Sequence, residues 1–229
     1  MSDYLLETRD LELAYGPFKA VAGVDLKVRA GTIHTIIGPN GAGKTSLFHC
    51  LTGERQATAG KILFNGQDII RKPSHGRVAL GMARSFQLTS LFQNLSVREN
   101  LRLAAQGRDG LGALNFWRSV EHKRSHWNTA DQVLERLKLS ARAETLAGEL
   151  SHGQQRVLEV GMSICAKPSL LMLDEPTSGM GIDDIPVMTD LISDLGRDHT
   201  VLLIEHNMSI VMSISQRITV MSHGQILVE

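Results

Sequence analysis

Three short, mainly apolar runs along the chain each end abruptly, one at a glycine-rich segment and two at charged residues. The runs are Ile33–Ile37, Leu170–Leu173 and Val201–Ile204. Continuous apolar runs of this length, with a helix-compatible stretch such as Ile185–Leu195 between two of them, are typical of parallel strands buried on both faces. The pattern therefore predicts an α/β fold built around a parallel sheet.

Other parts of the chain carry different patterns. Residues 4–28 alternate apolar and polar positions around turn signals, which predicts an opening antiparallel hairpin or small sheet. Ile62–Gln67 is typical of a strand that meets a turn, and Arg217–Val228 of a closing hairpin. Both ends of the chain are therefore expected to be rich in strands.

Between them, from Leu88 to Ile164, helical spacing replaces the alternation. The spacing predicts one helix starting at Val97 and another over Thr129–Leu139, whereas Gly107–Trp127 is expected to be a loop or short helices. We therefore expect three segments. Residues 1–87 form an N-terminal core part with an antiparallel β subdomain, residues 88–164 a helical subdomain, and residues 165–229 a C-terminal core part.

Composition narrows the possible partners and compartment. Among 229 residues, Lys+Arg and Asp+Glu both total 24, so no long-range field recruits nucleic acid and none is expected as a partner. The two cysteines show no metal-binding or disulfide spacing, which favours a reduced, cytosolic protein. We find neither a signal-peptide pattern nor an apolar run long enough to span a membrane.

The segment after the first apolar run is rich in glycine and ends in Lys-Thr, which fits G-x-x-x-x-G-K-[ST]. In such a loop, backbone N–H groups surround phosphate oxygens, the lysine reaches the outer phosphates and the hydroxyl binds magnesium. The alternative is a glycine-rich turn that carries Lys-Thr by chance, but the strand before it and the helix-compatible stretch after it favour a nucleotide site. Its residues are Gly38, Pro39, Asn40, Gly41, Ala42, Gly43, Lys44, Thr45 and Ser46.

Polar residues also follow the other two apolar runs, and the carboxyl ends of parallel strands meet at one edge of a sheet. Asp174 suits a Mg²⁺ ligand, and Glu175 suits a general base that orients and deprotonates the attacking water. His206 could hydrogen-bond the γ-phosphate or the water. The alternative for all three is an ordinary place at the end of a strand.

Three further features lie in or beside the helical part. Gln87 marks its start, and its amide could ligate magnesium. Ser151 is a candidate N-cap before an apolar-periodic helix, either as a second anion site or simply as a cap. His122 and His126 are spaced to share a metal, but without a third ligand a solvated face is expected instead.

In this order along nearly the whole chain, the motifs resemble those of the ATP-binding-cassette (ABC) ATPases. The resemblance implies a P-loop NTPase core with an antiparallel β subdomain and an inserted helical subdomain, with ATP and Mg²⁺ as ligands and Tyr15 stacked on the adenine. The Walker A loop corresponds to Gly38–Thr45, the Q-loop to Gln87 and the signature to Leu150–Gln154. The Walker B strand with its catalytic glutamate corresponds to Leu170–Glu175, the D-loop to Ser178–Gly181 and the switch histidine to His206.

The resemblance also implies a head-to-tail dimer with a second ABC ATPase subunit. In this arrangement Ser151, Gly153 and Gln154 of one chain close on ATP held by the Walker residues of the other. The chain departs from the family pattern at His152, where a glycine is usual, and at Gly181, where an aspartate is usual. The change at Gly181 removes one expected contact between the two chains.

Within that family, the segments Ala83–Asn100, Leu150–Glu159 and Glu205–Met212 look like those of importer ATPases for branched-chain amino acids, urea or related amides. This implies a peripheral protein on the inner face of the membrane, with a solute-binding protein acting indirectly. Integral membrane permease subunits would dock near Gln87–Leu95, through the apolar side chains of Leu91, Phe92 and Leu95.

Two rival functions remain open at this point. One is a non-transport ABC-type ATPase that acts on nucleic acid or ribosomes, although such relatives usually carry two cassettes or long coiled-coil insertions. The other is a P-loop kinase, in which the signature segment would have no purpose. A phosphorylated product in place of free phosphate would identify the kinase.

Overall fold

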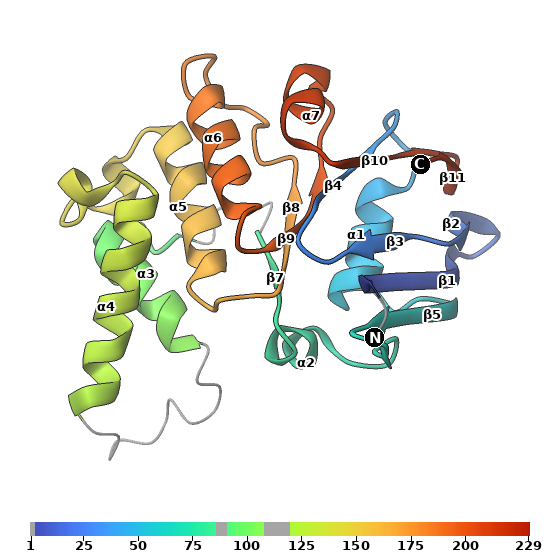
Figure 1. Cartoon of the computed structure of the whole chain (residues 1–229), viewed down its shortest axis with the longest axis horizontal. Helices are drawn as coiled ribbons and strands as arrows, with labels where there is room; N and C mark the ends of the chain where they lie inside the picture. The colour runs from blue at the N-terminus through green and yellow to red at the C-terminus, as the bar shows by residue number, and fades with distance from the viewer. Residues whose placement is uncertain (1–2, 86–90, 108–119) are drawn as a thin grey trace. The chain divides into compact units, whose positions relative to one another are not determined.

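The computed structural model describes residues 3–85, 91–107 and 120–229, which form two compact units (Figure 1). Within these ranges, no helix is both long enough and apolar enough to cross a membrane. The first unit comprises Met1–Arg84, Ser169–Glu175 and Ile192–Glu229, and the second comprises Ser85–Pro168 and Pro176–Leu191.

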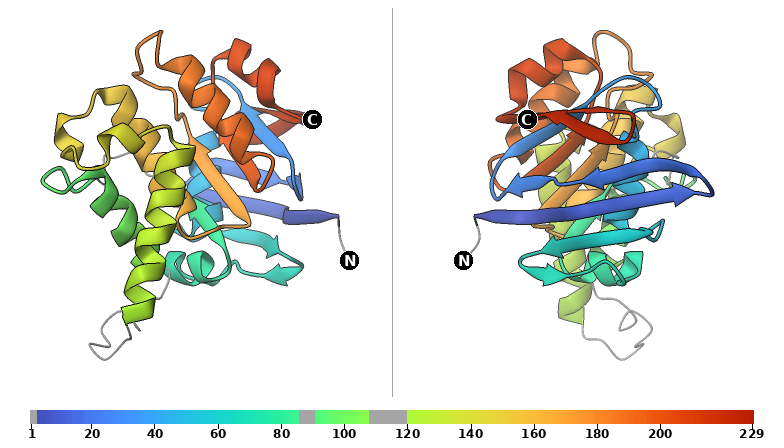
Figure 2. Two further views of the ribbon diagram at one scale, coloured as in Figure 1. Left: turned by 60° about the vertical axis from the view of Figure 1, so that its left-hand side comes forward. Right: turned by 90° about the vertical axis from the view of Figure 1, so that its right-hand side faces the viewer.

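The first unit contains the predicted antiparallel sheet near the N-terminus. Its strand order is β2-β1-β5-β6, and β3 also pairs with β1. Every pairing is antiparallel, and the long strand β1 is plainly visible beside β2 in Figure 2. The strands are β1 (Tyr4–Tyr15), β2 (Phe18–Val24), β3 (Lys27–Arg29), β5 (Ala59–Phe64) and β6 (Gln67–Asp68).

The second sheet of this unit has the order β11-β10-β4-β9-β8-β7. All of its pairings are parallel except that of β10 with β11, which form the predicted closing hairpin. The three apolar runs of the sequence are the central strands β4, β9 and β8, as predicted. The strands are β4 (Ile33–Ile37), β7 (Met82–Arg84), β8 (Leu170–Asp174), β9 (Thr200–Ile204), β10 (Arg217–Ser222) and β11 (Gln225–Val228).

Helix α1 (Lys44–Thr52) contacts strands of both sheets. Its Leu47, Phe48 and Leu51 are fully buried in the main hydrophobic core. Because α1 directly follows the glycine loop, this packing holds the start of the helix at the carboxyl end of β4. The first unit also contains α2 (Ser74–Ala79) and α7 (Met208–Ile214).

The second unit is helical. Helices α3 (Val97–Gly107), α4 (Val120–Arg136) and α5 (His152–Ile164) contact one another. The indole ring of Trp127 on α4 lies near the guanidinium groups of Arg98 and Arg102 on α3. Arg98 also binds both carboxylate oxygens of an aspartate on α4, at 2.7 and 2.8 Å.

The prediction of a loop or short helices over Gly107–Trp127 was wrong for the part that is described. Helix α4 already begins at Val120, nine residues before the expected start at Thr129. The segment contains neither glycine nor proline from residue 120 onward, and Trp127 gains its packing only in this helical arrangement. Residues 108–119 lie outside the described part of the chain. Helix α6 (Ile185–Leu195) has the predicted bounds.

Candidate nucleotide site

The loop between β4 and α1 has a backbone that only glycine fits at several points. Gly38, Gly41 and Gly43 have φ angles of 151°, 78° and 97°. A Cβ atom on Gly38 would collide with the carbonyl oxygen of Met221, and one on Gly43 with that of Ala20. These glycines therefore allow the loop to curl while it stays in close contact with β2 and β10.

Neighbouring backbone fixes the loop from behind. The Gly224 N–H, in the turn between β10 and β11, donates to the carbonyl oxygen of Ala42 at 2.9 Å. The Ala22 N–H on β2 donates to the Gly224 carbonyl oxygen at 2.8 Å. The hairpin turn thus joins the loop to the antiparallel sheet, which favours a rigid, preformed cradle.

The same loop presents positive charge. The side chain of Lys44 is buried, and its Nζ donates to the carbonyl oxygens of Gly38 at 2.7 Å and Pro39 at 3.1 Å. Helix α1 starts after Gly43 with no side-chain cap and no acidic residue in its first turn. Its N-terminal N–H groups and the ammonium group together suit an anion such as a phosphate chain.

The predicted carboxylates and imidazole follow adjacent strands. In the register of the parallel sheet, Asp174 pairs with Ile204, and Ile204 pairs with Ile36. Gly38 lies two residues beyond Ile36, and His206 lies two residues beyond Ile204. The fold therefore brings the ends of all three apolar runs to one edge of the sheet.

Asp174 is held in a dry environment. Its side chain is fully buried, and Arg84 Nη2 lies 3.2 Å from its Oδ2. Burial raises the pKa of this carboxyl group, with the neighbouring Glu175 adding to the rise, whereas Arg84 lowers it. Nothing in the sequence marked Arg84 as a partner, because the two residues are far apart along the chain.

Glu175 has an unusual backbone conformation. Its φ is 48°, in the left-handed region that non-glycine residues rarely adopt, and its N–H donates to the Ile204 carbonyl oxygen at 2.9 Å. The hydrogen bond ties the residue to the neighbouring strand β9. Strained residues of this kind cluster at functional sites, which agrees with the role predicted for Glu175.

The turn after β9 contains a carboxylate whose structural role the sequence did not reveal. Glu205 is fully buried, and its Oε2 accepts hydrogen bonds from the N–H groups of His206 at 3.1 Å and Asn207 at 3.4 Å. These bonds fix the backbone that carries His206, whose own side chain is exposed. The sequence did show Glu205 as a charged residue directly after the apolar run Val201–Ile204, but not the hydrogen bonds that it accepts.

The oxygen donors in this unit suit magnesium. Thr45 supplies a hydroxyl group on the first turn of α1 and Asp174 a carboxylate, and Mg²⁺ typically takes one or two carboxylates together with water and substrate phosphates. A metal site built only from His, Cys, Asp and Glu is a different case: among the described residues, no group of three or more of these side chains, with or without His126, could hold a metal. The predicted ligand Gln87 lies outside the described residues, as does the side chain of His122.

Tyr15 lies at the end of β1 and pairs across the first turn with Phe18. Both aromatic side chains are exposed, at 45% and 64%. Tyr15 is therefore accessible for the predicted stacking on a base, and Phe18 offers a second ring that the sequence reasoning did not consider.

In the second unit, Ser151 caps helix α5 as predicted. Its Oγ accepts from the Gln154 N–H, and the Gln154 side chain accepts from the Ser151 N–H, both at 3.2 Å. A Cβ atom on Gly153 would collide with the carboxylate of Asp184. The glycine thus allows the segment after the D-loop to pack directly against the first turn of α5.

The comparisons with known proteins identify the family of the chain. Residues 21–178, more than half of the chain, match the ABC transporter family. The chain belongs to the ABC transporter family. It is an ATP-binding ATPase subunit whose hydrolysis of ATP powers transport.

Similar relatives of this ABC ATPase include the high-affinity branched-chain amino acid transport ATP-binding protein BraF of Pseudomonas aeruginosa, 40% identical over 98% of this chain and 90% of that protein. LivG of Escherichia coli K12, which carries the same description, is 36% identical over 98% and 90%. The crystal structure of the ADP conformation of an ATP-binding cassette superposes with a TM-score of 0.86 at 31% identity, covering 99% of this chain and 90% of that one. The predicted fold class is confirmed.

The expected permease-docking loop of this ABC ATPase needs one correction. Leu91 is only 8% exposed in the single chain, so its side chain offers little surface to a partner. Phe92 is 54% exposed and Leu95 is half-buried. Asn100 fixes this turn, because its Nδ2 donates to the carbonyl oxygens of Phe92 and Leu95, at 3.1 and 3.3 Å. Residues 86–90 lie outside the described chain.

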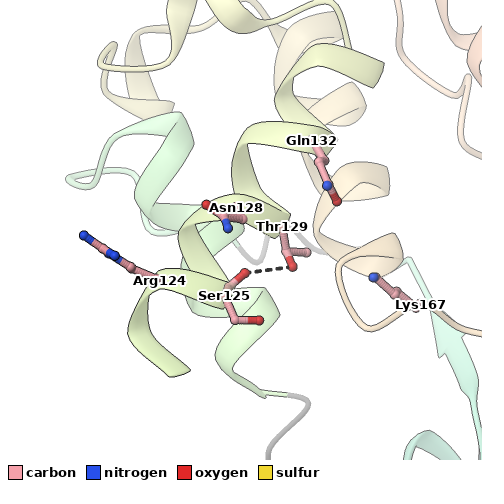
Figure 3. A pocket seen from close by; sticks show the side chains of 6 residues that line it. All are labelled: Arg124, Ser125, Asn128, Thr129, Gln132 and Lys167. Atoms are coloured by element: carbon pink, nitrogen blue, oxygen red, sulfur yellow. Dashed lines mark hydrogen bonds between the residues drawn. The ribbon is translucent and has the colours of Figure 1, made fainter. Parts of the chain in front are cut away.

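The second unit of the ABC ATPase also has a polar hollow along α4 (Figure 3). Within it the Thr129 hydroxyl donates to the Ser125 carbonyl oxygen at 3.1 Å. None of the residues predicted for nucleotide binding lines this hollow. Its lining residues are Arg124, Ser125, Asn128, Thr129, Gln132 and Lys167.

Proposed function

We propose that this ABC ATPase subunit powers the import of branched-chain amino acids or related amides. The proposal is supported by BraF and LivG, whose descriptions name branched-chain amino acid transport and which match nearly the whole chain. It is also supported by the motif segments that resemble importers of this class.

The observation that best supports the catalytic part is the row formed by Ile36, Ile204 and Asp174 across the parallel sheet. Beyond this row lie the glycine loop, Glu175 and His206. In the proposed mechanism Lys44 and the loop N–H groups bind the phosphates of ATP, and Glu175 orients and deprotonates the attacking water. His206 hydrogen-bonds the γ-phosphate, and Tyr15 stacks on the adenine.

Magnesium is part of this proposal. Thr45 and Asp174 would hold Mg²⁺, with Gln87 as a third protein ligand, and the cation would offset the negative charge that develops on the transferring phosphoryl group. The position of Thr45, one residue after Lys44, allows the hydroxyl and the ammonium group to serve neighbouring phosphate oxygens.

The proposed assembly has two ABC ATPase subunits and membrane permease subunits, with a solute-binding protein acting indirectly. Ser151, Gly153 and Gln154 of one chain would close on ATP bound by the other. Phe92 is the best described candidate for permease contact, because it is exposed while Asn100 holds its backbone. The subunit would then lie on the inner face of the cell membrane.

The role of Glu175 is tested by Glu175→Gln. We expect this variant to bind ATP normally and to accumulate an ATP-bound dimer, with phosphate release reduced at least about a hundredfold because the general base is lost. Phosphate release and size-exclusion chromatography in ATP measure both effects. Glu135→Gln, at an exposed position on α4, is the matched control. Hydrolysis at the control rate would remove Glu175 from this role.

The transport substrate needs a separate experiment. The subunit should be co-purified with its membrane partners and reconstituted, and ATP hydrolysis measured with leucine, isoleucine, valine or urea and the cognate solute-binding protein. Stimulation by a branched-chain amino acid is expected. Stimulation by an unrelated solute alone would contradict the proposed substrate class and leave the ATPase assignment intact.

A further inference from the structure

Arg84 connects two carboxylates inside the first unit. It is the last residue of β7, and its side chain is only 8% exposed. Its Nη1 lies 2.6 Å from Glu54 Oε1, and its Nη2 lies 3.2 Å from Asp174 Oδ2. The guanidinium group therefore joins the residue proposed to bind magnesium to a second, partly exposed carboxylate.

The connection extends to the helix that follows the glycine loop. Glu54 lies just beyond the end of α1, and its Oε2 is 3.5 Å from Nε2 of His49, which lies in the last turn of α1. Polar contacts thus run from α1 through Glu54 to β7 and on to β8. These elements carry the phosphate loop and Asp174, so the contacts join two parts of the same proposed site.

Charge and distance indicate what Arg84 does. The carboxylate of Asp174 is fully buried, and a buried carboxylate needs a nearby cation to remain charged and in one orientation. The contact with Glu54 is the shorter of the two made by Arg84. Arg84 is therefore held by Glu54 and can keep its contact with Asp174 when a metal ion binds there.

We propose that Arg84 is a positioning residue that orients the Asp174 carboxylate for Mg²⁺ and is itself oriented by Glu54. The proposal rests on the proposed role of Asp174 as a magnesium ligand. It predicts that loss of Arg84 weakens metal binding, whereas a guanidinium that competed with the metal for the same carboxylate would produce the opposite change.

The test measures metal binding without hydrolysis. Mn²⁺ bound in the presence of ADP is titrated by electron paramagnetic resonance, and the affinity for a fluorescent ADP analogue is measured in EDTA. For Arg84→Met we expect Mn²⁺ affinity to fall by about tenfold or more, in the range typical of residues that orient metal ligands, with unchanged nucleotide affinity in EDTA. Arg84→Lys should restore part of the metal affinity, and Glu54→Gln should lower it less than Arg84→Met does.

Two further variants make the outcomes distinguishable. Arg9→Met removes the exposed cation of an ion pair whose other partner, Glu7, is buried in the same unit, and it should leave Mn²⁺ affinity unchanged. Asp174→Asn tests the underlying proposal, because unchanged Mn²⁺ affinity in that variant would remove Asp174 as a ligand. If Asp174→Asn loses the metal while Arg84→Lys and Glu54→Gln bind it as well as or better than wild type, the role of Arg84 is overturned. If Arg84→Met does not fold, the metal affinities of Arg84→Lys and Glu54→Gln still test the role of Arg84.

Discussion

At the scale of single residues, His34 makes the stability of the protein depend on pH. It is fully buried in β4 with its Nε2 2.7 Å from Thr219 Oγ1, and burial together with Arg217 lowers its pKa from 6.5 to about 4. Between these two values the unfolded chain binds more protons than the folded chain. Stability is therefore complete above pH 6.5 and falls as the pH drops toward 4.

The shift corresponds to a loss of about 2 kcal/mol in the free energy of unfolding between pH 7.5 and pH 5. Urea unfolding at both pH values should show this loss in the wild type and a smaller loss in His34→Gln, which cannot take up the proton. His223→Gln, at an exposed turn position, is the control and should keep the wild-type difference. An undiminished loss in His34→Gln would assign the pH dependence to other groups.

The residues of the candidate site differ in how well the sequence predicts them. Lys44, Asp174 and Glu175 could be named because each lies in a short motif whose chemistry is local. Arg84 could not, because its role depends on a contact with a residue ninety positions away. Glu205 was part of the sequence pattern, but its bonds to the following N–H groups become visible only in the folded turn.

At the scale of secondary-structure elements, Arg77 stabilises the end of α1. Its side chain is almost completely buried and donates to the carbonyl oxygens of Cys50 and Leu51, in the last turns of the helix. It also donates to the carbonyl oxygens of Lys72 and Ile70, at 2.9 and 3.1 Å. The guanidinium group satisfies acceptors that the helix leaves open and offsets the negative end of its dipole.

We therefore expect Arg77→Met to lower the free energy of unfolding by about 3 kcal/mol or more, because several buried carbonyl groups lose their donors at once. Arg77→Lys keeps the charge but has fewer donors, so its loss should be intermediate. Chemical unfolding measures both variants, with Arg71→Met, an exposed position before α2, as the control. Equal stability of Arg77→Met and the control would show that α1 does not need this anchor.

The elements themselves were predictable to the extent that their patterns were strong. The strands β4, β8 and β9 were found nearly to the residue, because short, mainly apolar runs with a clear change of residue type at each end leave little choice of bounds. The strand β7 and helix α2 were not predicted, since segments of three and six residues are too short to show a period. The start of α4 was missed because most residues of its first two turns are polar, and the packing of Trp127 against α3 that supports the helix there cannot be seen in the sequence.

At the scale of the whole molecule, the proposed arrangement of two chains makes a prediction about mixed variants. Lys44→Ala disables the phosphate loop of a chain, and Ser151→Ala disables the segment proposed to act on the partner's nucleotide. A head-to-tail pair of these two inactive chains contains one site made of an intact loop and an intact Ser151. Mixing them in equal amounts should therefore restore about a quarter of the sites, since half of the pairs are mixed and each has one good site.

The matched control mixes Lys44→Ala with Glu175→Gln, both of which change residues of the first unit. Every site in that mixed pair retains one of the two defects if the loop and the base act on the same nucleotide, so no activity should return. Phosphate release, measured over a range of protein concentrations, follows the recovery and its dependence on pairing. Equal recovery in both mixtures, or recovery in neither, would contradict the arrangement, because only a nucleotide shared between Lys44 of one chain and Ser151 of the other makes the two mixtures differ.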